Sequence, residues 1–428
     1  MIHYKLHHPQ KNRDMHVELG RFGRIVLHLR YLSQNHKFRW HLAGIWRELL
    51  PAVVAGIAVS WFGFDTNLLA QPYSVSTNSL EQSSIATLRN DRESERSNAE
   101  TGASPAPTLS VPLVSLLGAS QWLNTQPLQP SDLRGKVVLV NFWTYSCINC
   151  LRMLPYVRAW AEKYKDHGLV VIGIETPEFT FEKDLANVRT ALASLGVNYP
   201  VVTDNDYKLW RAFDNQAWPA LYFIDAEGRI RHQVFGEGNY DQSEELIQKL
   251  LSEANGTSVS TNIVAARGKG IQAPADERDL GSAETYVGYE QARNFNSPGG
   301  IKEDVPKDYH DPSTLPLNQW SLAGIWTVTS EFASPQGTSG SVSYHFHARD
   351  LHLVLAPPAD GHPIRFRIRI DGAPPGANHG FDVDPGGWGS VREARLYQLI
   401  RQVGPVVDRT FEIEFFDPGV RVYDFTFG

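Results

Sequence analysis

Residues 109–254 alternate between short apolar runs and segments with helical spacing. The runs KVVLVNFW and GLVVIGI flank a stretch in which Leu154, Val157 and Trp160 repeat at helical intervals. Strands that alternate with helices predict βαβ units and a largely parallel central sheet. Farther along, YFIDAEGRIRHQVF predicts a hairpin and DQSEELIQKLLSEA predicts a last helix. This part of the chain is therefore expected to form an α/β domain.

The pattern changes after residue 278 to short strands separated by Gly, Pro and Asp turns. PIRFRIRID places Ile364, Phe366 and Ile368 on one face and arginines on the other, which is the period of a half-buried strand. Several similar runs follow the same rule. Strands of this length with turn signals between them predict a jelly-roll-like all-β sandwich domain over residues 278–428.

Two segments contain few large apolar residues and are expected to be flexible linkers, because they cannot bury enough surface to offset the entropy of ordering. They are residues 71–108 and 255–277. With the segments treated next, the predicted order is a basic arm (1–48), a membrane segment (49–70), a linker (71–108), the α/β domain (109–254), a linker (255–277) and the β-sandwich (278–428).

The membrane segment rests on LLPAVVAGIAVSWFGF, residues 49–64, which carry no charge over sixteen positions. A spanning helix usually needs roughly 20 apolar residues, so the run is marginal, but Trp46 and Trp61 suit the two interfaces. The basic arm before it predicts a cytoplasmic N-terminus. A cleaved signal peptide and a buried helix are the alternatives. Either an anchor or a signal peptide exports the remaining chain.

The charge is unevenly distributed. Residues 1–48 hold nine Lys or Arg against three acidic residues, about +6, so the net −7 of the whole chain leaves about −13 for the rest. An acidic body repels phosphate, which argues against a nucleic-acid-binding protein.

The only two cysteines are Cys147 and Cys150, in WTYSCINCLRMLP. A zinc site needs about four ligands, and the eight histidines after Glu48 show no paired spacing near the motif. A structural disulfide across so short a loop would contribute little. A helix N-terminus after a strand instead favours a thiolate. We expect Cys147 to be the exposed nucleophile and Cys150 the buried resolving thiol, with no metal and no cofactor beyond their redox-active disulfide.

Several longer motifs carry a family resemblance. They are NFWTYSCINC, TPEFTFEKD, WPALYFIDAEGRIRH, FGEGNYDQSEELIQKLL and, in the tail, NQWSLAGIWTV, FHARDLHLVL and DRTFEIEFFDPGVRVYDFTFG. The chain resembles thioredoxin-fold oxidoreductases of the TlpA/ResA kind, and most closely the extracytoplasmic portion of DipZ-type proteins. The resemblance implies a thioredoxin-like fold for residues 109–254, followed by the family's C-terminal β-sandwich. DipZ-type proteins begin with a multi-helix membrane electron carrier, whereas this chain has at most one span.

The resemblance also implies site residues. Pro219 matches the cis-proline that faces the disulfide, so that Trp218 could pair with substrate main chain. Glu178 is preferred over Glu175 as the buried carboxylate that takes the proton of Cys150, although an exposed acid leading a helix is the alternative. The remaining residues expected to bind substrate are Trp143 and Tyr145.

The expected function is a membrane-anchored, extracytoplasmic protein-disulfide reductase that acts on exported proteins, with cytochrome c biogenesis as an implied setting. Its electrons are expected from a membrane donor of the DsbD/CcdA type, because the chain carries no such module. The direction of electron flow stays open, since Ile148 and Asn149 match no known tuning pair. One alternative is a thiol peroxidase of the AhpC/TSA type, which Thr144 fits but Val140 does not. Another is a cell-envelope carbohydrate-binding protein with an accessory redox domain, for which Trp388 could stack on a sugar ring.

Overall fold

The computed structural model describes residues 14–18, 24–28, 111–117, 119 and 121–428, in two compact units, 1–100 and 101–428. In the first unit, β1 (Asp14–Glu18) and β2 (Arg24–His28) pair as an antiparallel hairpin. The expected membrane segment and first linker, residues 49–108, lie outside the described residues. Among the helices that are described, none has the length and apolar character needed to cross a bilayer.

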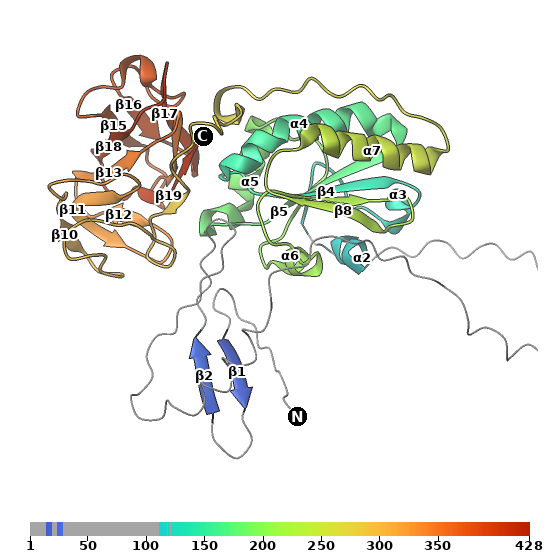
Figure 1. Cartoon of the computed structure of the whole chain (residues 1–428), viewed down its shortest axis with the longest axis horizontal. Helices are drawn as coiled ribbons and strands as arrows, with labels where there is room; N and C mark the ends of the chain where they lie inside the picture. The colour runs from blue at the N-terminus through green and yellow to red at the C-terminus, as the bar shows by residue number, and fades with distance from the viewer. Residues whose placement is uncertain (1–13, 19–23, 29–110, 118, 120) are drawn as a thin grey trace, which may run out of the picture. The chain divides into compact units, whose positions relative to one another are not determined.

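A six-stranded sheet forms the centre of the α/β domain (Figure 1). Its strands are β3 (Trp122–Leu123), β4 (Val137–Trp143), β5 (Leu169–Glu175), β6 (Val201–Thr203), β7 (Ala220–Ile224) and β8 (Ile230–Phe235). The strand order is β3-β6-β5-β4-β7-β8, in which β4, β5 and β6 are parallel and the others are antiparallel to their neighbours. The sheet is mixed and not largely parallel as expected, because only the β4–β5 and β5–β6 pairs are parallel. Its strand order and terminal β7–β8 hairpin confirm the predicted thioredoxin-like domain.

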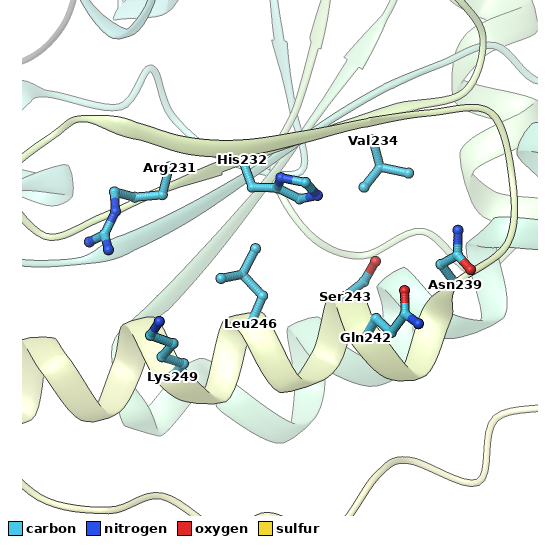
Figure 2. A pocket seen from close by; sticks show the side chains of 8 residues that line it. All are labelled: Arg231, His232, Val234, Asn239, Gln242, Ser243, Leu246 and Lys249. Atoms are coloured by element: carbon cyan, nitrogen blue, oxygen red, sulfur yellow. The ribbon is translucent and has the colours of Figure 1, made fainter. Parts of the chain in front are cut away.

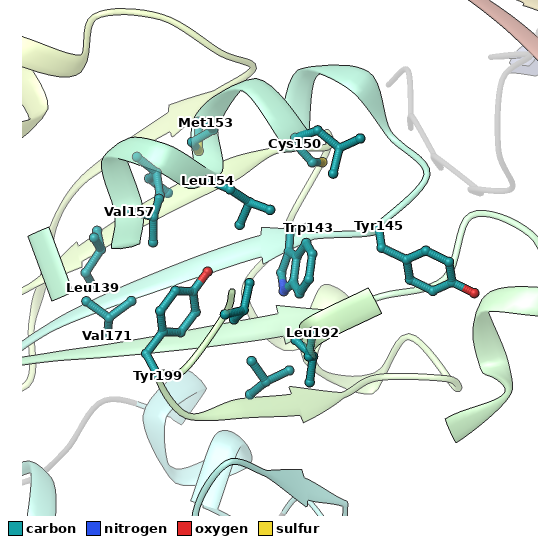
Figure 3. Packing of buried hydrophobic residues seen from close by; sticks show 14 of the residues in the cluster. Leu139, Trp143, Tyr145, Cys150, Met153, Leu154, Val157, Val171, Leu192 and Tyr199 are labelled. Carbon is teal, nitrogen blue, oxygen red and sulfur yellow. The ribbon is translucent and has the colours of Figure 1, made fainter. Parts of the chain in front are cut away.

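Helices cover both faces of that sheet. They are α2 (Val111–Leu117), α3 (Pro130–Leu133), α4 (Ile148–Tyr164), α5 (Leu185–Ser194), α6 (Lys208–Ala212) and α7 (Tyr240–Asn255), with 3₁₀ turns at Lys165–His167 and Thr180–Lys183. Alternate residues of β4 enter two different cores: Leu139 packs with α4, α5 and α7 (Figure 3), whereas Val140 packs with α2, α3 and α6. Burial of both faces explains why β4 reads as an unbroken apolar run.

The C-terminal domain is all β, as predicted. Its strands are β9 (Thr285–Tyr286), β10 (Lys307–Tyr309), β11 (Trp320–Val328), β12 (Ala333–Pro335), β13 (Gly340–Phe346), β14 (Asp350–Ala356), β15 (Ile364–Ile370), β16 (Trp388–Val391), β17 (Arg395–Arg401), β18 (Arg409–Phe415) and β19 (Arg421–Phe427). A short 3₁₀ turn covers Gly376–Asn378. The long strand β11 pairs with β13 through Trp320–Ala323, with β12 through Trp326–Val328 and with β10 through Gly324–Trp326. The inward residues of these strands share one core.

The α/β domain and the C-terminal domain contact each other directly. Tyr423 on β19 lies against the rings of Phe179 and Phe181, with centroids 5.0 and 4.9 Å away. Arg152 on α4 donates a hydrogen bond of 2.9 Å to the carbonyl oxygen of Phe427. Both sides of β14 are buried, one by the C-terminal core and the other by this contact. The C-terminal domain is therefore packed directly beside the helix that follows the cysteines.

Residues 255–277 do not behave as the expected flexible linker. The segment runs along α7 and α4 (Figure 1), and its Gly270–Gln272 forms a 3₁₀ turn. Val264 donates its N–H to a carboxylate oxygen of Glu244 at 2.9 Å, and Gln272 accepts from Arg158 at 3.2 Å. Composition alone missed this because the stabilising partners lie on α4 and α7 rather than in the segment itself.

Candidate active site

Both cysteines lie at the N-terminus of α4, just after β4. Cys147 is the N-cap residue, in an extended conformation, and Cys150 lies one turn into the helix. The backbone N–H of Cys150 donates to the sulfur of Cys147 at 3.3 Å, and both residues are free thiols. A helix begins with N–H groups that lack intrahelical partners, and here one of them points at the first sulfur. The predicted placement of the pair is confirmed.

The environment of Cys147 is less open than predicted. Its side chain is half-buried, whereas Cys150 is fully buried. Burial raises the pKa of Cys147 well above its ordinary value, and Cys150 and the carboxylate of Glu178 raise it further. The hydrogen bond from the Cys150 N–H lowers the pKa but does not overcome these effects. The reduced site therefore favours the thiol form of Cys147, contrary to the thiolate that the helix terminus alone suggests.

Glu182 holds the loop that leads into Cys147. Its Oε1 accepts hydrogen bonds from the hydroxyls of Thr144 and Ser146, at 2.5 and 2.6 Å, and from the Ser146 N–H at 3.3 Å. Its Oε2 accepts from the N–H groups of Glu178 and Phe179, at 2.6 and 2.9 Å. A fully buried carboxylate thus joins the segment before the nucleophile to the segment after β5. Sequence reasoning missed Glu182, whose only signal was its place in TPEFTFEKD, directly after Phe181.

A second carboxylate, Glu175, lies next to this junction. It ends β5 and is fully buried, with Thr144 as a distant hydrogen-bond partner at 3.5 Å and its Oε2 without one. Burial raises the pKa of Glu175 well above its usual range, and the like charge of Glu182 raises it again. Burial also raises the pKa of Glu182, although its several donors oppose the shift. Of the two, Glu175 is the one that more readily keeps its proton.

Glu178 is the carboxylate whose charge acts on Cys147, and it is half-buried rather than exposed. Its side chain accepts a hydrogen bond from the hydroxyl of Tyr286, on the first strand of the C-terminal domain. A half-buried carboxylate fits the predicted proton acceptor better than it fits the alternative, an exposed acid at the start of a helix. Its role in taking the proton of Cys150 stays a prediction.

The Trp218–Pro219 peptide bond is cis, as predicted. Trp218 is half-buried; its indole N–H donates to the carbonyl of Thr176 at 3.0 Å, and its ring lies 4.2 Å from that of Trp210. The cis bond is thus held beside the loop that follows β5, which also carries Glu178. Pairing of Trp218 with substrate main chain remains a prediction.

Trp143 and Tyr145 are not surface residues, so the expectation that they contact substrate is wrong. Trp143 is 1% exposed and Tyr145 4% exposed, and both belong to the core beneath α4 (Figure 3). The hydroxyl of Tyr145 donates to the carbonyl of Phe181 at 3.4 Å. Alternation along β4 and the turn after it directs both rings inward, which the proximity of the two residues to the cysteines did not reveal.

A groove of about 330 Å³ lies between β8 and α7 (Figure 2), with Arg231, Val234, Leu246 and Lys249 among its lining residues. None of its lining residues belongs to the segments that carry the cysteines or the cis-proline. Within the described part of the chain, no group of three or more His, Cys, Asp or Glu side chains is placed to hold a metal ion.

Family models match both domains. A model described as the AhpC/TSA family covers residues 103–233, and one described as a thioredoxin-like C-terminal domain covers residues 282–428. The second match coincides with the all-β domain. The first coincides with the α/β domain and its cysteines.

Named relatives agree with these matches. Protein DipZ of Mycobacterium tuberculosis is 36% identical over 294 residues, which are 68% of this chain and 41% of DipZ. Thiol-disulfide oxidoreductase YkuV of Bacillus subtilis is 29% identical over 33% of this chain and 95% of its own. Thiol-disulfide oxidoreductase ResA of Bacillus thuringiensis is 29% identical over 30% of this chain and 71% of its own. The resemblance to ResA-like and DipZ-type proteins is therefore confirmed, although the match spans only about two fifths of DipZ.

Proposed function

We propose that this chain is a thiol–disulfide oxidoreductase that reduces disulfides in exported proteins. The observation that carries the proposal is the hydrogen bond from the Cys150 N–H to the Cys147 sulfur at the start of α4. This geometry holds the two sulfurs within one helical turn, as formation of a disulfide between them requires. The relatives named thiol-disulfide oxidoreductases support the same activity.

The reaction runs through a mixed disulfide. The Cys147 thiolate attacks one sulfur of the substrate disulfide, and the other substrate sulfur leaves and takes up a proton. Cys150 then loses its proton, for which Glu178 is the proposed acceptor, and attacks the Cys147 sulfur. The second substrate thiol is released and Cys147 and Cys150 become a disulfide. The two electrons of the dithiol have passed to the substrate, so a donor must restore them.

The setting is proposed from the sequence. Residues 49–70 would anchor the chain in the cytoplasmic membrane, with residues 109–428 in the periplasm or cell exterior. The donor would be a membrane electron carrier of the DsbD/CcdA type, and cytochrome c biogenesis is one process that needs such a reductant.

A thiol peroxidase is a second candidate, because the AhpC/TSA model covers the cysteines. The site supports it less well. Val140, where a peroxidase motif requires proline, is buried in β4, and the hydroxyl of Thr144 donates to Glu182 instead of facing a peroxide. The relatives named thiol-disulfide oxidoreductases favour disulfide exchange.

A carbohydrate ligand of the C-terminal domain is also proposed. Trp388 is 45% exposed at the start of β16, and Arg367 lies over its ring at 5.2 Å. Exposed aromatic faces suit stacking on a sugar ring. Trp320 and Trp326, by contrast, are fully buried core residues. Quenching of tryptophan fluorescence by glycan fragments, in the full chain and in Trp388→Ala, tests the idea; equal quenching in both would reject this site.

The activity is tested with the full chain in detergent. The reduction potential is measured in glutathione or dithiothreitol buffers, beside turnover of a disulfide substrate and of hydrogen peroxide. A potential near about −270 mV supports a reductase, and one near about −120 mV indicates a disulfide donor. Faster turnover of peroxide than of disulfide would favour the peroxidase. Absence of a two-electron couple, or full activity in Cys147→Ser, would reject the proposal.

A further inference from the structure

Tyr286 connects the C-terminal domain to the surroundings of the cysteines through a hydrogen bond. The hydroxyl of Tyr286, on β9, donates to the Oε1 of Glu178, in the segment after β5. The ring of Tyr286 also lies 6.2 Å from that of Phe179, the next residue. Glu178 and Phe179, which are neighbours in the chain, therefore both face the side chain of Tyr286 in the C-terminal domain.

Glu178 is held from two directions. Its backbone N–H donates to Glu182 at 2.6 Å, and Glu182 also binds Ser146, the residue directly before Cys147. Its side chain is bound by Tyr286. The first contact fixes the position of the main chain beside the active-site loop, and the second fixes where the carboxylate points.

We propose that Tyr286 is a positioning residue that holds the Glu178 carboxylate in place next to the active-site loop, so that the C-terminal domain takes part in the redox site. This inference rests on the proposed thiol–disulfide function. It explains why a β-sheet domain packs against the face of the α/β domain that carries the cysteines.

The protonation states agree with this role. Burial, and then the charge of Glu178, raise the pKa of Tyr286, so the phenol keeps its proton and acts as the donor. The carboxylate of Glu178 in turn disfavours the thiolate of Cys147. The same carboxylate is then ready to accept a proton when Cys150 attacks.

Other ionisable groups face this site and contribute to the electrostatic environment of Cys147, Glu178 and Tyr286. Glu284 accepts from Tyr286 at 3.3 Å, as an alternative partner for the phenol proton. Cys147 is faced by Cys150 and Glu178. The groups that act on Glu178 or on its partner are Glu182, Tyr207, Glu284, Tyr286 and Asp424.

The test uses the reduced full chain and the rate at which iodoacetamide alkylates Cys147, followed by peptide mass spectrometry from pH 6 to 10. Tyr286→Phe removes only the phenol oxygen. We expect alkylation of Cys147 near pH 7 to become roughly threefold faster or more, because the carboxylate that disfavours the thiolate is no longer held in place. Glu178→Gln should act in the same direction, and the double variant should match Glu178→Gln because the two residues act as one unit.

Tyr289→Phe is the matched control, because its hydroxyl donates to Asp304 at 3.0 Å, a carboxylate in the same domain but outside this site. It should leave the alkylation profile unchanged. A purely structural Tyr286 would lower thermal stability without moving the profile, and that outcome would overturn the proposal. Additive shifts in the double variant would overturn it as well. Disulfide turnover by the unmodified chain is measured separately, so a failure of the proposed function is recognised independently.

Discussion

Ser146, the residue before the proposed nucleophile, donates both its hydroxyl and its N–H to one oxygen of Glu182, at 2.6 and 3.3 Å. The two residues are 36 positions apart in the chain. Because Glu182 also binds Thr144 and the N–H groups after β5, one buried carboxylate fixes two loops relative to each other.

Replacement of Glu182 by alanine should therefore destabilise the protein strongly. The change leaves several buried donors without an acceptor, at about 1–3 kcal/mol each before relaxation. We expect the free energy of unfolding to fall by about 3 kcal/mol or more in urea titrations of the full chain. Glu162→Ala is the control, because Glu162 is 76% exposed and pairs with Lys165 at the surface; it should change stability by less than about 0.5 kcal/mol. Equal effects of the two substitutions would contradict the role given to Glu182.

Glu175 should make stability decrease as the pH rises. Its pKa is raised in the folded protein by burial and by Glu182, so above the ordinary pKa of 4.5 the unfolded chain releases the proton more readily than the folded one. Its contribution is full below that pH and is lost as the pH rises toward the folded pKa. Glu175→Gln removes the titration. The melting temperature of this variant, relative to the unmodified chain, should increase steadily from pH 5 to 8; a constant difference would count against the assignment.

His352 should have the opposite dependence. It is fully buried on β14, and burial lowers its pKa from 6.5 to about 3. Between those values the unfolded chain binds a proton that the folded chain does not, so stability falls as the pH falls, by roughly 1.4 kcal/mol per pH unit. His352→Asn should flatten this acid limb, with about 2 kcal/mol less loss between pH 7 and pH 5. Urea midpoints at the two pH values give the slope, which is independent of any constant cost of the substitution. Parallel slopes would show that His352 does not carry the effect.

The interdomain contact should make the two domains unfold together. Tyr423 is 1% exposed and packs on Phe179, Phe181 and Phe332. Tyr423→Ala should cost about 3–5 kcal/mol and separate the calorimetric transition into two, because it removes the largest ring at the contact. Phe381→Ala, at a position 80% exposed, should cost less than about 0.5 kcal/mol and keep a single transition. A single, unshifted transition in Tyr423→Ala would mean that the contact contributes little to stability.

What the sequence could predict is what local pattern encodes. The order of strands and helices between residues 109 and 254 follows from short apolar runs and helical spacing, which depend on neighbouring residues only. Cys147 and Cys150 could be identified as a redox pair because they are the only cysteines in the sequence and because their spacing places them on one helical turn. The position of Pro219 came from a motif shared with relatives. The unbroken apolar run of β4 indicated a strand, but it did not show that the rings of Trp143 and Tyr145 would point into the core.

The tertiary structure decided everything that depends on residues far apart. Glu182 reaches Ser146 across 36 positions, and Tyr286 reaches Glu178 across 108, which no periodicity records. Burial then changed the chemistry: it raised the pKa of Cys147, which the helix terminus alone would lower, and it took Trp143 and Tyr145 away from substrate. The physical reason is that desolvation depends on what packs around a group in three dimensions. The sequence by itself thus determined which atoms can react, whereas the packing of the two domains determined the environment in which they do so.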